Sequence, residues 1–156
     1  MKKNLKNIYL FGIVFVIVDQ ILKIILSNKM IVNQNFIIIK NFFSIRFAHN
    51  TGAAFSILSD SRVLLAFIGI AALIGLIFYI RSLEIIDDID AFSYALLIGG
   101  ITGNLIDRII YGYVIDYLSF NFGDYYFPIF NFADICIVGS VILIFASALK
   151  GDLWKE

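Results

Sequence analysis

Two aspartates, Asp116 in "YVIDYLSF" and Asp134 in "FNFADIC", lie in or beside strongly apolar stretches. Two carboxylates that are close together in a poorly solvated site cannot both ionise, so they share one proton and one pKa rises. The ionised partner can take a proton from water while the protonated partner donates to a carbonyl oxygen. This pair of residues is therefore suited to hydrolysing a peptide bond without a metal or a covalent intermediate.

Each aspartate taken alone has a simpler explanation, because it can cap a helix or pair with Arg108. The sequence contains no other set of residues suited to catalysing hydrolysis. It has one histidine, His49, one cysteine, Cys136, inside an apolar run, and no H-E-x-x-H motif. We expect no metal and no cofactor.

Asp19 and Lys23 lie four residues apart in an apolar stretch, so on a helix they share a face, with the acid N-terminal to the base. Ionisable residues inside membrane segments are rare and usually face the bundle interior. One explanation is that the two side chains form an ion pair, which either neutralises itself or binds a neighbouring helix. A direct contact with substrate is the alternative.

The stretch "GGITGNLIDR" at 99–108 places Asn104, Asp107 and Arg108 at helical positions i, i+3 and i+4. Asp107 and Arg108 are adjacent, so they point in different directions and need separate partners. Structural and substrate-binding roles both remain open for Asn104 and Arg108, and the planar guanidinium can hold a carbonyl or carboxylate. The three glycines of the stretch allow another helix to approach closely.

The composition is typical of a membrane protein, with 61% hydrophobic and 15% charged residues and a mean hydropathy of +0.93. The formal net charge is zero, which gives no basic surface for nucleic acid. The apolar N-terminal stretch lacks a small-x-small cleavage site, so we expect a retained first span. The sequence predicts one domain over 1–156 with four spans, each long enough to cross the bilayer, at 8–26, 63–80, 91–111 and 129–149.

An even number of spans puts both termini on one side, and the distribution of lysine and arginine favours the cytoplasm. The segments 27–62 and 112–128 then face outward. "NFIIIKNFFSIRF" predicts short strands, and the Gly123-Asp124 pair predicts a hairpin turn. Asn50 or Thr51 can cap a brief amphipathic helix. Because open sheet edges cannot sit in lipid, we expect this β-element to rest on the outer membrane surface.

This topology places the two aspartates at the same depth, because the chain leaves the membrane and returns between them. Asp134 is expected about one turn, or roughly 7 Å, past the start of the last helix. Asn131, three residues earlier, shares the face of Asp134.

Five motifs resemble those of the lipoprotein signal peptidases, the type II signal peptidases of bacteria. They are "NTGAAFS" at 50–56, "GNLIDR" at 103–108, "VID" with an aromatic at 114–117, "FNFAD" at 130–134 and D-x-x-x-K at 19–23. The resemblance covers essentially the whole chain. The one departure is Val-Ile-Asp where the family commonly has Val-Val-Asp, which leaves the chemistry unchanged.

The resemblance implies a four-helix membrane aspartyl endopeptidase with a small extracytoplasmic β-cradle. Such an enzyme removes the signal peptide of prolipoproteins just before a diacylglyceryl-modified cysteine. It implies that Asp116 and Asp134 form the catalytic dyad. The residues implied to line the site or position substrate are Asn50, Gly52, Asn104, Arg108, Asn131 and Ala133, and those implied to give supporting polar contacts are Asp19, Lys23 and Asp107.

The expected partners are lipid-modified prolipoproteins and membrane lipids, and the resemblance implies inhibition by the cyclic peptide globomycin. We expect a monomer in the bacterial cytoplasmic membrane, with the site near the extracytoplasmic face. The outer segment 50–60 is a candidate cover for that site.

Two other classes of protein fit the sequence less well. A small proton-coupled transporter would use Asp19, Asp107 and Asp134 as a relay through the bilayer, yet the acids gather toward one side and the second window has none. A non-catalytic tetraspan adaptor gives no reason for paired acids. Another type of intramembrane aspartyl protease would carry Gly-x-Gly-Asp, and "NFGD" at 121–124 lacks the first glycine.

Overall fold

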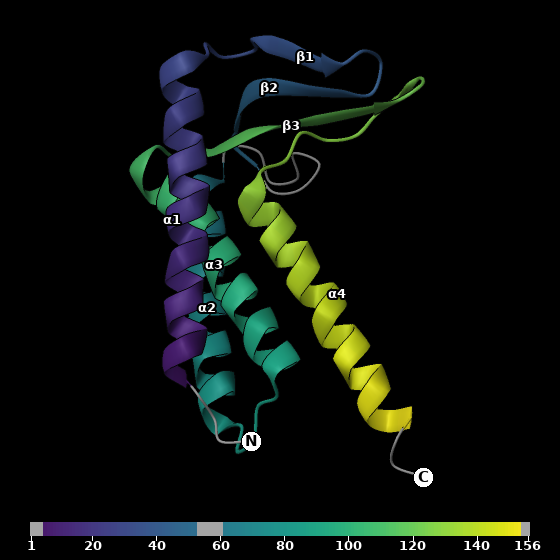
Figure 1. Cartoon of the computed structure of the whole chain (residues 1–156). Helices are drawn as coiled ribbons and strands as arrows, with labels where there is room; N and C mark the ends of the chain where they lie inside the picture. The colour runs from purple at the N-terminus through teal and green to yellow at the C-terminus, as the bar shows by residue number, and fades with distance from the viewer. Residues whose placement is uncertain (1–4, 53–60, 154–156) are drawn as a thin grey trace.

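The computed structural model describes residues 5–52 and 61–153, and it forms a helical bundle with a small sheet at one end (Figure 1). The elements in chain order are α1 (Leu5–Lys29), β1 (Asn35–Ile39), β2 (Phe43–Asn50), α2 (Arg62–Ser82), α3 (Asp88–Ile110), β3 (Val114–Phe122), β4 (Tyr125–Tyr126) and α4 (Phe132–Leu153).

Within the described residues, four helices are long and apolar enough to cross a membrane, which confirms the predicted number of spans. The apolar window of α3 is 44% buried, against 11–22% for the other three helices. The central helix is therefore α3, and the other three expose apolar side chains of the kind that contact lipid. Figure 1 shows α1 beginning and α4 ending at the end of the bundle opposite the sheet.

Close packing around α3 depends on its glycines. A Cβ atom added at Gly103 would lie 2.5 Å from Oδ2 of Asp19 on α1, and one added at Gly100 would lie 2.5 Å from the carbonyl oxygen of Ala133 on α4. The small residues thus let both neighbouring helices approach, as the sequence predicted. One of those neighbours brings a buried carboxylate against the α3 backbone.

The strands form one antiparallel sheet in the order β1-β2-β3-β4. The predicted strands and hairpin are confirmed, and Gly123 takes a φ of +69° at the turn, a conformation that glycine adopts freely. Ile115 and Tyr117 of β3 pack with Phe47 against Leu22 and Leu26 of α1. Side chains alternate along a strand, so Asp116 points to the opposite face.

The helices begin and end one to four residues away from their predicted bounds, and two of these differences have a visible cause. The last helix begins at Phe132 rather than at 129, because Phe130 pairs with Leu118 and extends the sheet. The third helix begins at Asp88 rather than at 91. The Asp87 side chain caps it by accepting a hydrogen bond from the backbone N–H of Asp90. Most of the brief helix expected after Asn50 lies in 53–60, outside the described residues.

Candidate active site

Strand β3 carries Asp116 into a buried position at the sheet end of the bundle, where it is 3% exposed. Its Oδ1 accepts a hydrogen bond of 2.7 Å from Nδ2 of Asn131, and its Oδ2 accepts one of 2.8 Å from Nδ2 of Asn50. Asp116 lies beyond the end of α3, in the outer segment 112–128 for which the sequence predicted a hairpin, and pairing with Ala48 of β2 fixes its orientation.

Asp134 lies in the first turn of α4 and is partly buried. Its Oδ2 accepts from the backbone N–H of Asn131 at 3.1 Å, and Oδ1 of Asn131 accepts from the backbone N–H of Asp134 at 2.9 Å. This reciprocal pair is a capping box. The other carboxylate oxygen accepts from Nδ2 of Asn104 at 2.8 Å. Asp134 does cap a helix, and the cap itself connects it to Asp116 through Asn131.

The environment of Asp116 favours its protonated form. Burial, followed by the nearby charge of Asp134, raises the pKa of Asp116 to about 7. The hydrogen bonds from Asn50 and Asn131 and the charge of Lys23 act in the opposite direction but are smaller. A carboxyl with a pKa near neutrality can hold or release a proton at the pH of most cells.

Arg108 and Asp107 have separate partners, as their adjacency predicted. Nη2 of Arg108 donates to the carbonyl oxygen of Gly52 at 3.1 Å, and Nη1 donates to that of Asn104 at 3.4 Å. Within the described ranges, Arg108 forms no ion pair with Asp116 or Asp134. Oδ2 of Asp107 accepts from the backbone N–H of Ile115 at 3.1 Å, which ties α3 to β3.

A buried ionic cluster lies behind the two acids. Nζ of Lys23 is 2.8 Å from Oδ2 of Asp19 and 2.8 Å from Oδ2 of Asp107, and it donates to Oδ1 of Asn104 at 3.2 Å. Oδ1 of Asp19 accepts from the backbone N–H of Ala133 in α4 at 3.1 Å. Asp19 and Lys23 therefore form an ion pair that also binds neighbouring helices, one of the two explanations that the sequence left open.

The structure adds two residues that the sequence analysis did not select. Nε2 of Gln20 donates to Asp107 at 3.0 Å and to Asp19 at 3.2 Å. The hydroxyl oxygen of Tyr117 accepts from the backbone N–H of Phe132 at 3.2 Å, and burial raises the pKa of this phenol, so it stays protonated. The available signals were a glutamine in an apolar span and an aromatic residue beside Asp116.

The predicted site residues thus form one connected group drawn from α1, β2, β3, α3 and α4. Within the part of the chain that the structure describes, no group of three or more histidine, cysteine, aspartate or glutamate side chains is placed to hold a metal ion. The hydrogen-bonding groups nearest the two acids are asparagine amides.

Comparison with known proteins identifies the group to which this arrangement belongs. The signature described as Signal peptidase (SPase) II matches residues 11–150. The chain belongs to the signal peptidase II family. It is therefore a peptidase, and its four apolar helices make it an integral membrane protein.

Relatives and solved structures agree with the signal peptidase II assignment. A lipoprotein signal peptidase of Symbiobacterium thermophilum is 41% identical over 134 residues, which cover 86% of this chain and 88% of the relative. One of Clostridium tetani is 35% identical and is matched over 90% of this chain and 91% of its own length. A solved bacterial membrane enzyme superposes with a TM-score of 0.91 at 34% identity, covering 99% of this chain and 94% of the other.

Proposed function

We propose that this chain is an aspartic endopeptidase that removes the signal peptide from diacylglyceryl-modified prolipoproteins, cleaving before the lipidated cysteine. The observation that carries the proposal is the pair of acids, Asp116 and Asp134, joined through Asn131 in a poorly solvated site. Lipoprotein signal peptidase is also the name of its relatives.

The catalytic cycle needs one proton shared by the two carboxyl groups. The ionised carboxylate takes a proton from water as the oxygen attacks the scissile carbonyl carbon, and the protonated partner gives its proton to the carbonyl oxygen. Collapse of the tetrahedral intermediate breaks the C–N bond, and the leaving amine takes a proton from the pair. The raised pKa of Asp116, about 7, supports a proton held by the pair at neutral pH. The proton belongs to the pair rather than to one named residue.

Surrounding polar groups position the acids and the substrate in this proposal. Asn50, Asn104 and Asn131 donate to the carboxylates and fix their orientation. The guanidinium group of Arg108, which donates to the carbonyl oxygen of Gly52, can also hold a peptide carbonyl of the substrate. Ala133 keeps α4 close to Asp19, while Asp19, Lys23 and Asp107 support the site from behind.

The position of the site at the sheet end fits a bond that lies where a signal helix leaves the membrane. We propose that both termini are cytoplasmic, that the sheet end faces the extracytoplasmic side of the cytoplasmic membrane, and that the protein acts as a monomer. The family assignment does not favour the alternative of a proton-coupled transporter.

Substitution of each acid tests the dyad. Asp116→Asn and Asp134→Asn should each reduce cleavage of a prolipoprotein by at least about a thousandfold while the purified protein stays folded, since each removes one of two proton-transfer groups. The mass of the product measures cleavage. Asp124→Asn, at an exposed position in the β3–β4 turn, is the matched control and should cleave at the native rate. Near-native cleavage by either dyad variant would exclude the assignment.

The substrate class is tested separately with the unmodified enzyme. A lipidated precursor and the same precursor without its diacylglyceryl group are incubated with purified protein, with and without globomycin. We expect loss of the leader mass only from the lipidated form and only without globomycin. Equal cleavage of both precursors would contradict the requirement for lipid but not the dyad.

A further inference from the structure

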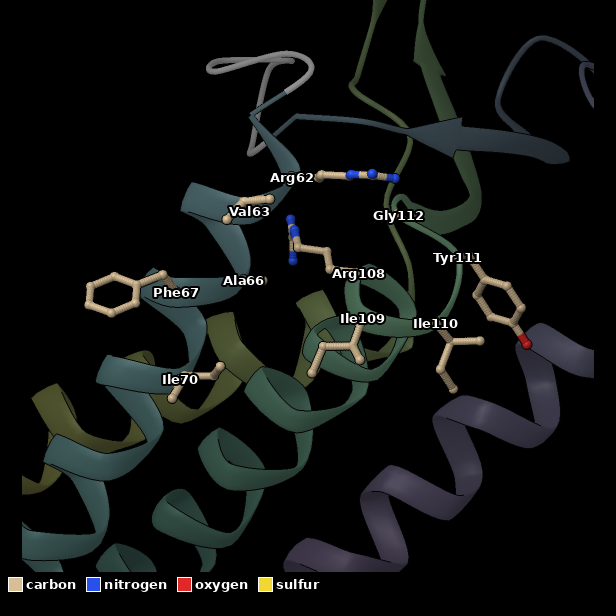
Figure 2. Close-up of a pocket in the computed structure, with 10 residues that line it drawn as sticks. All are labelled: Arg62, Val63, Ala66, Phe67, Ile70, Arg108, Ile109, Ile110, Tyr111 and Gly112. Carbon is tan, nitrogen blue, oxygen red and sulfur yellow. The ribbon is translucent and has the colours of Figure 1, made fainter.

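A cavity of about 490 Å³ lies between α2 and α3 at the sheet end of the bundle (Figure 2). On one side it is bounded by Arg62, Val63, Ala66 and Phe67 in the first turns of α2. On the other side are the last residues of α3 and the turn that follows, 108–112. None of the residues from α2 takes part in the proposed site.

The lower walls of the cavity are apolar and open outward. Val63 is 76% exposed, Phe67 is 67% exposed and Ile109 is 63% exposed, and all three lie on helices that cross the membrane. Side chains of this kind at this position contact the acyl chains of lipids rather than water. A ligand in this groove therefore has an apolar tail.

The upper rim of the cavity is positively charged. Figure 2 shows the guanidinium group of Arg108 between α2 and α3, with that of Arg62 above it. Arg108 donates to two backbone carbonyls, and Arg62 makes no ion pair with an acid in the described ranges. Tyr111 lines the same cavity, and tyrosine is enriched at the level of lipid headgroups.

We propose that this cavity binds an anionic phospholipid from the leaflet around the sheet end of the bundle. Its phosphate contacts Arg62 and Arg108, and an acyl chain lies along Val63, Phe67 and Ile109. Arginine binds phosphate through two parallel N–H donors, which makes the contact stronger than one to a neutral ester. Charge at the rim and apolar walls below it select a phosphate with a tail over a free anion or a neutral lipid.

Arg108 connects the bound lipid to the proposed site, because the same guanidinium donates to Gly52 beside Asn50 and Asp116. The lipid is thus a ligand that helps to hold this side of the site in place. Lipid binding is measured directly, so the inference stands or falls independently of the proposed cleavage reaction.

The test is binding of defined lipids to the purified full chain in detergent, by native mass spectrometry and by thermal stabilisation. The probes are phosphatidylglycerol, phosphatidylcholine with the same acyl chains, diacylglycerol and inorganic phosphate. Phosphatidylglycerol should bind and stabilise most. Arg62→Gln should weaken its binding at least about tenfold, in line with loss of one charge-assisted phosphate contact. Ala66→Trp, which fills the groove but keeps both arginines, should weaken it as well.

Arg81→Gln is the matched control, because it removes the same charge from the opposite end of the same helix. It should bind phosphatidylglycerol like the unmodified protein. Equal binding of diacylglycerol and phosphatidylglycerol, native affinity of Arg62→Gln, or an equal loss in Arg81→Gln would each overturn the proposal.

Discussion

Two pairs of carboxylates lie in the core of this protein, and different groups join them. Asp19 and Asp107 flank the ammonium group of Lys23, at 2.8 Å on each side. Asp116 and Asp134 are joined only through asparagine, since Asn131 donates to both. The first pair has a cation within contact distance, whereas the second has neutral donors.

This difference fits a structural role for the first pair and the proposed chemical role for the second. A buried carboxylate that contacts a buried cation is balanced in charge, and removing that cation carries a large cost in stability. A carboxyl group among neutral amides, close to another carboxyl group, retains a proton near neutral pH. This contrast supports the proposal that the lysine cluster holds the site in place and that the asparagine-linked pair exchanges a proton in catalysis.

The largest expected effect is on stability, from removing the cation of the first pair. Lys23→Met leaves two buried carboxylates without a counter-charge, which should lower the free energy of unfolding by about 3–5 kcal/mol. Unfolding in mixed detergent micelles measures the change. Lys29→Met, at an exposed position near the end of the same helix, should change it by less than about 0.5 kcal/mol. A loss below 1 kcal/mol in Lys23→Met would show that the two pairs do not differ in this way.

Substitution of Asp116 in the second pair should become less destabilising as pH rises. The native pKa of Asp116, about 7, lies above the unfolded value of about 3.9, so the native state keeps its proton longer. Native stability from this group is present below pH 4 and is lost as pH rises to 7. Asp116→Asn removes this dependence.

The stability of Asp116→Asn relative to the unmodified protein should therefore rise by about 2–4 kcal/mol between pH 4 and pH 8. Unfolding curves at the two pH values measure it. Asp124→Asn, at an exposed turn position, should show no such trend. A flat difference for Asp116→Asn would mean that this carboxyl is ionised throughout.

The smallest expected effect concerns the amide donors. The hydrogen bond from Asn50 favours the ionised form of Asp116, so Asn50→Ala should raise the pKa of Asp116 further. In the proposed mechanism, activity requires the shared proton and falls as pH rises through that pKa. The alkaline limb of kcat/KM should therefore move to higher pH in Asn50→Ala, by less than about one unit. Asn28→Ala, exposed at the end of α1, should leave the limb in place, and a shift to lower pH in Asn50→Ala would contradict the role of the amide.

Much of this architecture could be predicted from the sequence, because the signals are local. Apolar length gave the four helices, and β-branched and aromatic runs gave the strands. The predicted start of α4 at 129 is three residues early, because pairing of Phe130 with Leu118 is a tertiary contact that local apolar length does not reveal. The sequence predicted the ion pair of Asp19 and Lys23 but not the second partner of Lys23, Asp107, since that contact joins residues far apart in the chain.

The amino end of α4 has a consequence for how the protein is assembled. Its first backbone N–H groups are held by side chains that precede it in the chain, Phe132 by Tyr117 and Ala133 by Asp19. The helix that carries Asp134 therefore docks onto acceptors set in place by segments synthesised earlier. A nascent chain halted before Phe132 would lack Asp134, one of the two acids of the proposed dyad, and the backbone N–H of Ala133 that donates to Asp19.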